Sequence, residues 1–494
     1  KEPAMKPQTL TLITLAALLT ACQSTTIEHR SQITLPAAYD HAAPARADNT
    51  DIRRWWQAWH DPVLNQLITE ALANNPDIAI ARSRLKEAQA TVNLADADRG
   101  ATIGLGLNAG HLDADLDNPL GGTPLARSDK INTHKTVLAT NLSAKWEADL
   151  FGQKQSDADA ARYAALASAE QTHAAQLQIS AAVADAYLQA RAIEARQQLA
   201  DANIATLEKL AHYVEARYRA GHTTTYENTE AQSHLTAARA ARSTLEAERA
   251  AQIRKIAVLL GKTPQGYQLP ASRADALNQP PAPPSGQTPQ GLIERRPDLR
   301  ARAAEIQARS AQLASAKADL LPRFDIQFLW QTGRIELNSD LAPFNRARSG
   351  NGGLFSIGVQ LPLFTAGRIR ANIQAADARL QTALLQYDQT LLQALADVDN
   401  AYQAQHSLNT QQQELQQAER TAKQQVRNDR QLFRYGRKTL DTALQSQLSA
   451  HGFSQNLLDN QLASGLNLLN LYKAIGSGWQ EEGTQPAASE AAAK

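Results

Sequence analysis

An internal repeat limits what this chain can fold into more than any other feature. Three pairs of identical residues stand 215 positions apart: Gly152 and Gly367, Tyr187 and Tyr402, and Gly221 and Gly436. A register that stays constant over some seventy residues is not a chance similarity. The chain therefore carries two copies of one unit, and its fold must contain each structural element twice.

Two segments in each copy alternate between apolar and polar residues, which is the period of a strand with one apolar and one wet face. The first copy has Ile103 to Leu107 and Leu138 to Ala148, and the second has Phe324 to Trp330 and Phe355 to Leu363. We expect four strands per chain. They pair as two hairpins across loops rich in Gly, Pro and Asn, at Asn118 to Asp129 and at Ser339 to Gly352.

Two long stretches without proline, 152–263 and 363–485, can be helical throughout. From Ile179 to Tyr218 a seam of mostly apolar residues recurs in steps of four and three, which predicts a coiled coil. The seam of the second copy, Leu408 to Phe433, is interrupted by polar residues and is weaker. Each stretch breaks at one glycine, Gly221 or Gly436, and then resumes. We interpret each as a helical hairpin; a kinked helix is the alternative.

Composition excludes several classes of protein. A mean hydropathy of -0.42 and the lack of an apolar run near 20 residues exclude a polytopic helical membrane protein, so any membrane passage is by strands. A net charge of +1 shows no excess of basic residues of the kind that binds nucleic acid. A single cysteine excludes a disulfide framework. Four strands cannot close a barrel, so copies must associate. Two copies are the minimum, because outer-membrane barrels start at about eight strands; three copies would give twelve.

The N-terminal region has the pattern of a bacterial lipoprotein signal. Met5 and Lys6 precede an apolar stretch of about twelve residues, and a small-residue cleavage site leads to Cys22, the lone cysteine. Cys22 would then become the acylated mature N-terminus, carrying lipid such as palmitate. Gln23 follows it in place of the Asp that favours inner-membrane retention in similar lipoproteins, which indicates the outer membrane. The alternative is an ordinary signal peptide.

Together these patterns predict a linear order of segments. They are a signal peptide (5–21), an extended N-terminal segment (22–54), first-repeat periplasmic helices (55–99), a first β-hairpin (100–151), a first long helical hairpin (152–263), a Pro-rich connector (264–291), a second-repeat helix (292–321), a second β-hairpin (322–364), a second long helical hairpin (365–476) and a C-terminal tail (477–494).

Several motifs resemble those of the TolC family of outer membrane factors, specifically its lipoprotein (NodT-type) branch serving multidrug efflux. They lie between Trp55 and Trp479 and comprise Asp61-Pro62-Val63-Leu64, Asn75-Pro76-Asp77, Trp146-Glu147-Ala148-Asp149-Leu150-Phe151-Gly152, Arg295-Arg296-Pro297-Asp298-Leu299-Arg300, Leu361-Pro362-Leu363-Phe364 and Leu471-Tyr472-Lys473-Ala474-Ile475-Gly476-Ser477-Gly478-Trp479. The resemblance implies a homotrimer with a twelve-stranded outer-membrane β-barrel, continued by an α-helical periplasmic tunnel. It also implies two partners, a periplasmic adaptor (membrane fusion protein) and an inner-membrane pump of the resistance-nodulation or major facilitator type.

By the same resemblance, the tunnel closes at its periplasmic end near the second hairpin turn. Where TolC has a Tyr and an Arg that link helices, this chain has Phe433 and Lys438; where TolC has two Asp, it has Thr442 and Gln445. Asp441 lies one residue before Thr442. We hypothesise that three copies of Asp441 form the constriction and disfavour anions; the alternative is a solvated Asp.

The first hairpin has equivalent positions. Glu227 and Glu230 stand where Thr442 and Gln445 stand in the second hairpin, and they can supplement the gate. The turns themselves carry positive charge and, by resemblance, face the adaptor. The residues expected there are Arg219, Gly221, Arg434 and Gly436.

Other motifs give little support to an enzyme. The acidic spacing at His111 to Asn118 lacks the later ligands of a calcium loop, so we interpret it as an external loop. Gly104, Gly106 and Gly110 miss the dinucleotide-binding spacing, and no paired-His motif or nucleophile elbow is present. Trp146 and Trp330 lie within strands, as interfacial girdle or packing residues.

We therefore expect no catalysis, no cofactor, no metal and no nucleic-acid partner. The expected function is a passive outer-membrane exit duct for drugs and other small toxic compounds. A type I protein secretion duct is the alternative within the same fold. A structural coiled-coil envelope lipoprotein is the alternative from another class, and the alternating strands oppose it.

Overall fold

The computed structural model describes residues 33–40, 42, 52–117, 130–339 and 346–479. The chain divides into two compact units. Of the described residues, the first contains 87–117, 130–165, 305–339 and 346–384, and the second contains 33–40, 42, 52–86, 166–304 and 385–479. Across the described ranges, none of the helices is both long enough and apolar enough to span a bilayer.

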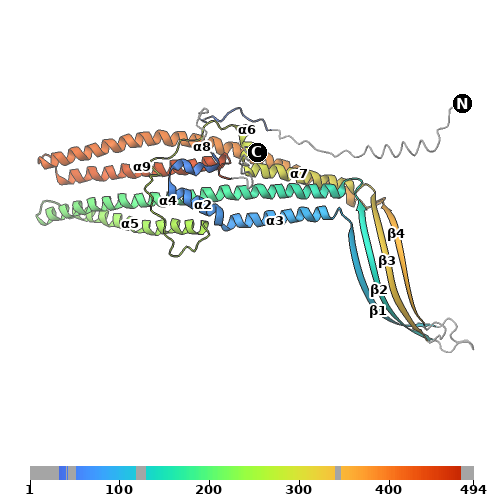
Figure 1. Cartoon of the computed structure of the whole chain (residues 1–494). Helices are drawn as coiled ribbons and strands as arrows, with labels where there is room; N and C mark the ends of the chain where they lie inside the picture. Colours follow the sequence, from blue (N-terminus) through green and yellow to red (C-terminus); the bar gives the residue numbers. More distant parts are fainter. Residues whose placement is uncertain (1–32, 41, 43–51, 118–129, 340–345, 480–494) are drawn as a thin grey trace, which may run out of the picture. The chain divides into compact units, whose positions relative to one another are not determined.

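The first unit is built on a four-stranded antiparallel sheet in the order β1-β2-β3-β4 (Figure 1). Its strands are β1 (Thr102–Asp117), β2 (Lys130–Ala148), β3 (Arg323–Ser339) and β4 (Arg346–Gln360). The central pairing joins the two repeats, because β2 belongs to the first copy and β3 to the second. Among the strands that the structure describes, β1 and β4 each pair on one side only.

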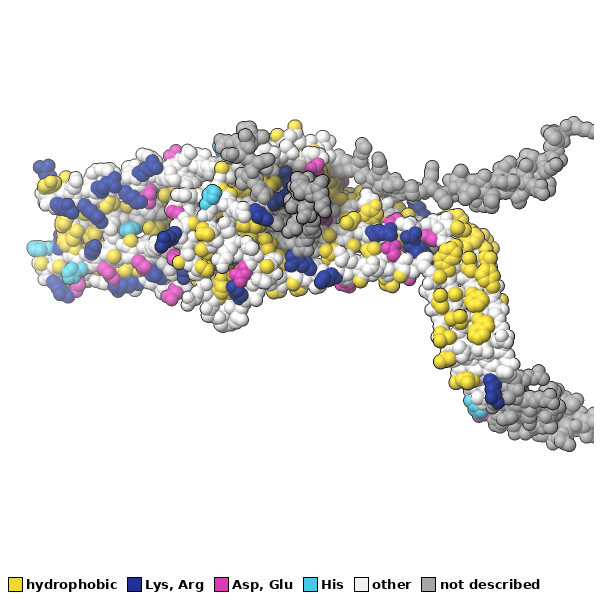
Figure 2. Space-filling model, in the orientation of Figure 1, with side chains coloured by type: hydrophobic (Ala, Val, Ile, Leu, Met, Phe, Trp, Pro, Cys, Tyr) yellow, Lys and Arg dark blue, Asp and Glu magenta, His cyan; other side chains and the backbone are white. Residues whose placement is uncertain are grey.

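One face of this sheet is apolar and exposed. The register places Leu142 of β2 between Leu105 and Trp330, and Ala144 between Ile103 and Phe328. Figure 2 shows hydrophobic side chains gathered over the strands. The large exposed members of this face are Ile103, Leu105, Leu107, Leu138, Leu142, Trp146, Phe328, Trp330, Phe355, Ile357 and Val359. The other face is mostly polar or small, with Asn141, Ser143, Gln327, Gln331 and Ser356.

The structure corrects three boundaries expected from the sequence. β4 begins at Arg346, so the loop expected at Ser339 to Gly352 is too long. Its glycines pair with β3 nonetheless, because backbone hydrogen bonds do not need a side chain. β4 ends at Gln360, before Pro362, which has no N–H to donate. The segment from His111 to Asp117 belongs to β1 and is not an external loop.

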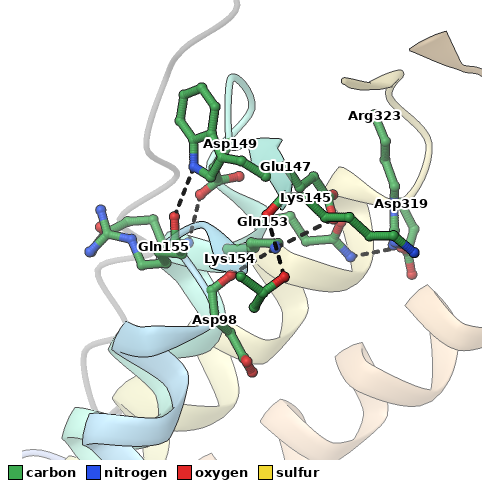
Figure 3. Close-up of polar contacts among 12 residues, drawn as sticks. Asp98, Lys145, Glu147, Asp149, Gln153, Lys154, Gln155, Asp319 and Arg323 are labelled. Carbon is green, nitrogen blue, oxygen red and sulfur yellow. Dashed lines mark hydrogen bonds and ion pairs between the residues drawn. The ribbon is translucent and has the colours of Figure 1, made fainter. Parts of the chain in front are cut away.

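Polar contacts join the ends of α3 and α7 to the start of α4 and to the first residue of β3 (Figure 3). Lys154 Nζ donates to the backbone oxygen of Asp98 at 2.8 Å. Asp319 Oδ1 accepts from Gln153 Nε2 at 2.8 Å and from Arg323 at 2.6 Å. These contacts tie together the segments where the chain passes between the sheet and the helices.

Nine helices account for most of the described remainder of the chain. The long ones are α4 (Gln153–Arg219) and α8 (Arg368–Arg434), of 67 residues each, and α5 (Thr225–Leu259) and α9 (Leu440–Ala474), of 35 residues each. At 1.5 Å per residue, 67 residues extend about 100 Å. The shorter ones are the 3-10 helix η1 (Ile52–Trp59), α2 (Pro62–Asn74), α3 (Pro76–Ala97), α6 (Pro289–Arg295) and α7 (Pro297–Ala318).

The second unit has an aromatic core in which distant segments meet. Trp55 stacks on Tyr472 with ring centroids 5.4 Å apart. Tyr187 Oη donates to Asp61 Oδ2 at 2.5 Å, and Asp61 also caps α2 by accepting from the backbone N–H of Val63. Burial raises the pKa of Tyr187 to about 12, so its hydroxyl stays a donor at neutral pH.

Candidate functional site: the ends of the helical hairpins

The first hairpin turns between α4 and α5, where Gly221 adopts a φ of +75°, a conformation that favours glycine. Thr224 caps α5, and Glu227 completes a capping box: the Glu227 N–H donates to Thr224 Oγ1, while Glu227 Oε2 accepts from the Thr224 N–H at 2.9 Å. Arg219, the last residue of α4, pairs with Glu215 at 2.5 Å.

The carboxylate of Glu227 is therefore engaged within its own turn. A hydrogen bond from the Thr223 side chain, followed by the one from the Thr224 backbone, lowers the pKa of Glu227. Glu230, one turn further along α5, is exposed and lies 4.0 Å from His234 Nε2. Of the two acidic residues that the sequence placed near the gate in this hairpin, Glu230 is the one not used by the helix cap.

The second hairpin repeats this geometry with different side chains. Gly436 has a φ of +69°, and Thr439 caps α9 by accepting from the N–H of Thr442 at 3.4 Å. Because Thr442 replaces the glutamate of the first hairpin, no capping box forms here. Asp441 lies in the first turn of α9 and is partly exposed, and Gln445 follows one turn later, also exposed.

Lys438 is held within its own hairpin. Its Nζ lies 2.6 Å from Asp429 Oδ1, and the Asp429 side chain is 4% exposed. The hydrogen bond from the Lys438 ammonium group lowers the pKa of Asp429. Asp429 belongs to α8 and stands one turn after Val426, on the buried side of that helix. Phe433, on the last turn of α8, is 40% exposed.

One side of α8 near this turn carries exposed cations at helical spacing: Arg420, Lys423, Arg427, Arg430 and Arg434. Lys423 pairs with Glu419 at 2.6 Å, and Arg430 donates to Gln447 at 2.7 Å. The positions 215 residues earlier hold Ala205, Glu208, His212, Glu215 and Arg219. The two hairpins therefore differ in charge although their backbones are equivalent.

A groove of about 470 Å³ lies between α4, α5 and α9. Its lining includes Arg196, Leu207, Leu210, His234, Gln445 and His451. Beside it, Gln447 Nε2 donates to Thr206 Oγ1 at 2.7 Å, which joins α9 to α4. Burial lowers the pKa of His451, so that imidazole stays neutral at neutral pH. Gln445 therefore lies on a surface shared by both hairpins.

The structure thus groups the sequence-predicted residues into two turns. Arg219, Gly221, Glu227 and Glu230 lie at the first, and Phe433, Arg434, Gly436, Lys438, Asp441, Thr442 and Gln445 lie at the second. Cys22 lies outside the described residues. Sequence reasoning missed Asp429, whose signal was a charge at a seam position, and the pair of Thr206 and Gln447, whose members stand 241 residues apart.

Comparisons with known proteins agree with this architecture. The family model "Outer membrane efflux protein" matches residues 67–262 and 288–477. The pyoverdine export outer membrane protein OpmQ of Pseudomonas aeruginosa is 30% identical over 485 residues, covering 97% of this chain and 98% of OpmQ. The cation efflux system protein CusC of Escherichia coli K12 is 26% identical and covers 96% of this chain and 100% of CusC.

Solved structures show the same fold. The outer membrane channel MtrE of Neisseria gonorrhoeae superposes with a TM-score of 0.76 at 23% identity, over 92% of this chain and 98% of MtrE. The helical hairpins and the four-stranded sheet expected from the sequence are confirmed, as is the resemblance to a family of outer membrane efflux channels. The chain therefore belongs to the outer membrane efflux protein family and is an outer-membrane channel of an efflux system.

Proposed function

We propose that three copies of this chain join their sheets into one twelve-stranded barrel, and that the barrel is the outer-membrane part of a passive export duct. The observation that carries the proposal is the sheet itself. Its outer strands, β1 of 16 residues and β4 of 15 residues, each have one edge that no described strand of this chain pairs with. In a bilayer those edges must pair with other strands, because each unsatisfied backbone group costs several kcal/mol.

The height of the apolar face supports a membrane position. On β2 it runs from Leu138 to Ala148, ten residue steps, which is about 33 Å along the strand. A strand tilted by about 40° would project this length to about 25 Å, the height of the apolar band on outer-membrane barrels. The mostly polar opposite face would line the water-filled interior.

The two helical hairpins would continue the duct into the periplasm, and their turns would form its far end. The gate would include Asp441, Gln445 and Glu230, which are not engaged in helix caps, with Phe433 and Thr442 beside them. Lys438 would act through Asp429 by holding the second turn. The exposed tips at Arg219, Gly221, Arg434 and Gly436 would meet a periplasmic adaptor, which links the duct to an inner-membrane pump.

The cargo we propose is small molecules, drugs and other toxic compounds among them. The names of the relatives support a small cargo of varied chemistry, since one exports pyoverdine and another serves cation efflux. A duct of this kind moves solutes without a reaction, and the free energy comes from the pump. Acylation of Cys22 would add an anchor in the outer membrane.

The test is drug susceptibility of a strain that lacks the gene, complemented with wild type or with Cys22→Ser. Dyes, detergents and antibiotics are compared, and the secreted proteins in the medium are analysed in parallel. Sensitivity restored by the wild-type gene supports small-molecule export. Unchanged susceptibility together with the loss of a secreted protein would instead establish the protein-secretion duct. Full complementation by Cys22→Ser would refute a required lipid anchor.

A further inference from the structure

A contact within the chain shows how one hairpin packs on the other. Gln447 of α9 donates its Nε2 to Thr206 Oγ1 of α4 at 2.7 Å, and Thr206 is 2% exposed. Thr206 Oγ1 in turn donates to the backbone oxygen of Ala202 at 3.0 Å. The threonine hydroxyl thus uses its one proton within α4 and accepts from α9 through a lone pair.

The repeat contains the same two side chains a second time. The position 215 residues after Thr206 is Thr421 of α8, and the position 215 residues before Gln447 is Gln232 of α5. Thr421 Oγ1 already donates to the backbone oxygen of Gln417 at 2.9 Å, as Thr206 does to Ala202. Both Thr421 and Gln232 are exposed in the single chain. Thr421 and Gln232 therefore have the side chains that this contact needs, but within the single chain they do not form it.

We infer that α8 of one copy packs against α5 of a neighbouring copy as α4 packs against α9 within one chain, and that Gln232 of the neighbouring copy donates to Thr421. The inference rests on the proposed assembly and names the residues through which copies meet in the helical part. The equivalence of the two repeats carries it: α4 with α8, and α9 with α5, have equal lengths and equal turn geometry.

The contact between copies is less apolar than the contact within a chain. Around Thr206, a buried cluster contains Leu207, Leu210 and Leu444. The equivalent residues are Ala422 and Gln425 on α8 and Thr229 on α5. Replacing three leucines with smaller or polar groups removes most of the apolar area that the interface can bury, so this contact is the weaker of the two.

The amide of Gln232 is also held less firmly than that of Gln447. Gln447 Oε1 accepts from Arg430 at 2.7 Å, which fixes the orientation of the amide. The position equivalent to Arg430 is Glu215, whose carboxylate accepts hydrogen bonds and cannot donate to Gln232 Oε1. Near the hairpin turns, the contact between α8 and α5 of neighbouring copies therefore separates before the contact between α4 and α9 within a chain.

Cysteine cross-linking in outer-membrane preparations tests this contact. The double variant Thr421→Cys with Gln232→Cys is treated with a bis-methanethiosulfonate reagent of short reach, and its mass is read on a denaturing gel without reductant. We expect covalent dimers and trimers. The matched control, Thr206→Cys with Gln447→Cys, contains the observed contact and should cross-link within the chain without a dimer band.

Further controls separate the possible failures. Each single variant reports any contribution of Cys22. Thr421→Cys with Arg239→Cys should stay monomeric, because Arg239 lies two turns, about 10 Å, further along α5 than Gln232 and outside the reach of the reagent. If the native protein is trimeric by light scattering but the Thr421 and Gln232 pair gives no dimer, the inference is wrong and the proposed assembly stands. If the native protein is monomeric, the proposed assembly itself is overturned.

Discussion

Lys438 and Asp429 close the second helical hairpin through a contact of 2.6 Å between Nζ and Oδ1, across the turn that joins α8 to α9. They stand nine positions apart in the chain. The equivalent positions of the first hairpin are Thr223 and Val214, which cannot form an ion pair. The first turn is instead held by the capping box of Thr224 and Glu227. The two turns are thus stabilised by different chemistry.

Removing the ammonium group should loosen the second turn. Lys438→Met leaves a nearly buried carboxylate without its charged partner, and we expect a loss of about 2 kcal/mol of local stability. Hydrogen exchange of the backbone amides around the turn measures this loss. Arg437→Met, which removes an exposed neighbouring charge, is the control. Equal protection in the two variants would show that the ion pair does not hold the turn.

The same pair should make the second turn sensitive to acid. The pKa of Asp429 is lowered in the folded protein, so its stabilisation is complete above the ordinary Asp value of about 3.9 and is lost as pH falls through the lowered value. Exchange protection should therefore stay level down to about pH 4 and decrease below it. In Asp429→Asn this dependence should vanish. A decrease of the same size in that variant would assign it to other groups.

Neutralising Asp441 tests the proposed gate. If three Asp441 carboxylates surround the constriction, Asp441→Asn should reduce the preference of the channel for cations over anions. The negative carboxylates repel anions most strongly where little water screens them. Reversal potentials in planar bilayers under a KCl gradient measure the preference. Asp459→Asn is the control, since Asp459 pairs with Arg196 at 2.7 Å. Unchanged selectivity and conductance in Asp441→Asn would refute the hypothesis.

The repeated tyrosines should differ in how much stability they contribute. Tyr187 donates to the buried carboxylate of Asp61, whereas Tyr402 donates to the backbone oxygen of Pro284 at 2.7 Å. Hydrogen bonds to charged groups contribute more than neutral ones, so Tyr187→Phe should cost about 2 kcal/mol and Tyr402→Phe about 1 kcal/mol. Chemical unfolding in detergent gives both values. A larger loss in Tyr402→Phe would contradict the order.

Much of the fold could be predicted from the sequence, because its signals are long and regular. The proline-free stretches and the 3.5-residue seam predicted hairpins whose long arms, α4 and α8, have 67 residues each. The strands followed from strict alternation. The start of β4 did not, because Gly350 and Gly352 have low strand propensity, and their pairing with β3 outweighs it.

The candidate site was less predictable. Glycine and the break in the helical pattern indicated where the turns are, but not which side chains the turns use. Glu227 looked like a free acidic residue until the cap geometry showed its carboxylate accepting from Thr224. Asp429 stands at a position of the helical seam where the pattern predicts an apolar residue. Both assignments depend on distances between side chains, which spacing along the chain does not give.

The internal repeat also has a consequence for how such a channel can change over generations. In a ring of six identical subunits, one mutation alters all six joints at once. A ring of three chains, each carrying two related halves, has two kinds of joint that diverge independently. Leucines could accumulate at one kind, around Leu207 and Leu444, while Ala422 and Thr229 kept the other small and polar. In the proposed trimer, gene duplication would let a single polypeptide encode three contacts rich in leucine and three weaker ones.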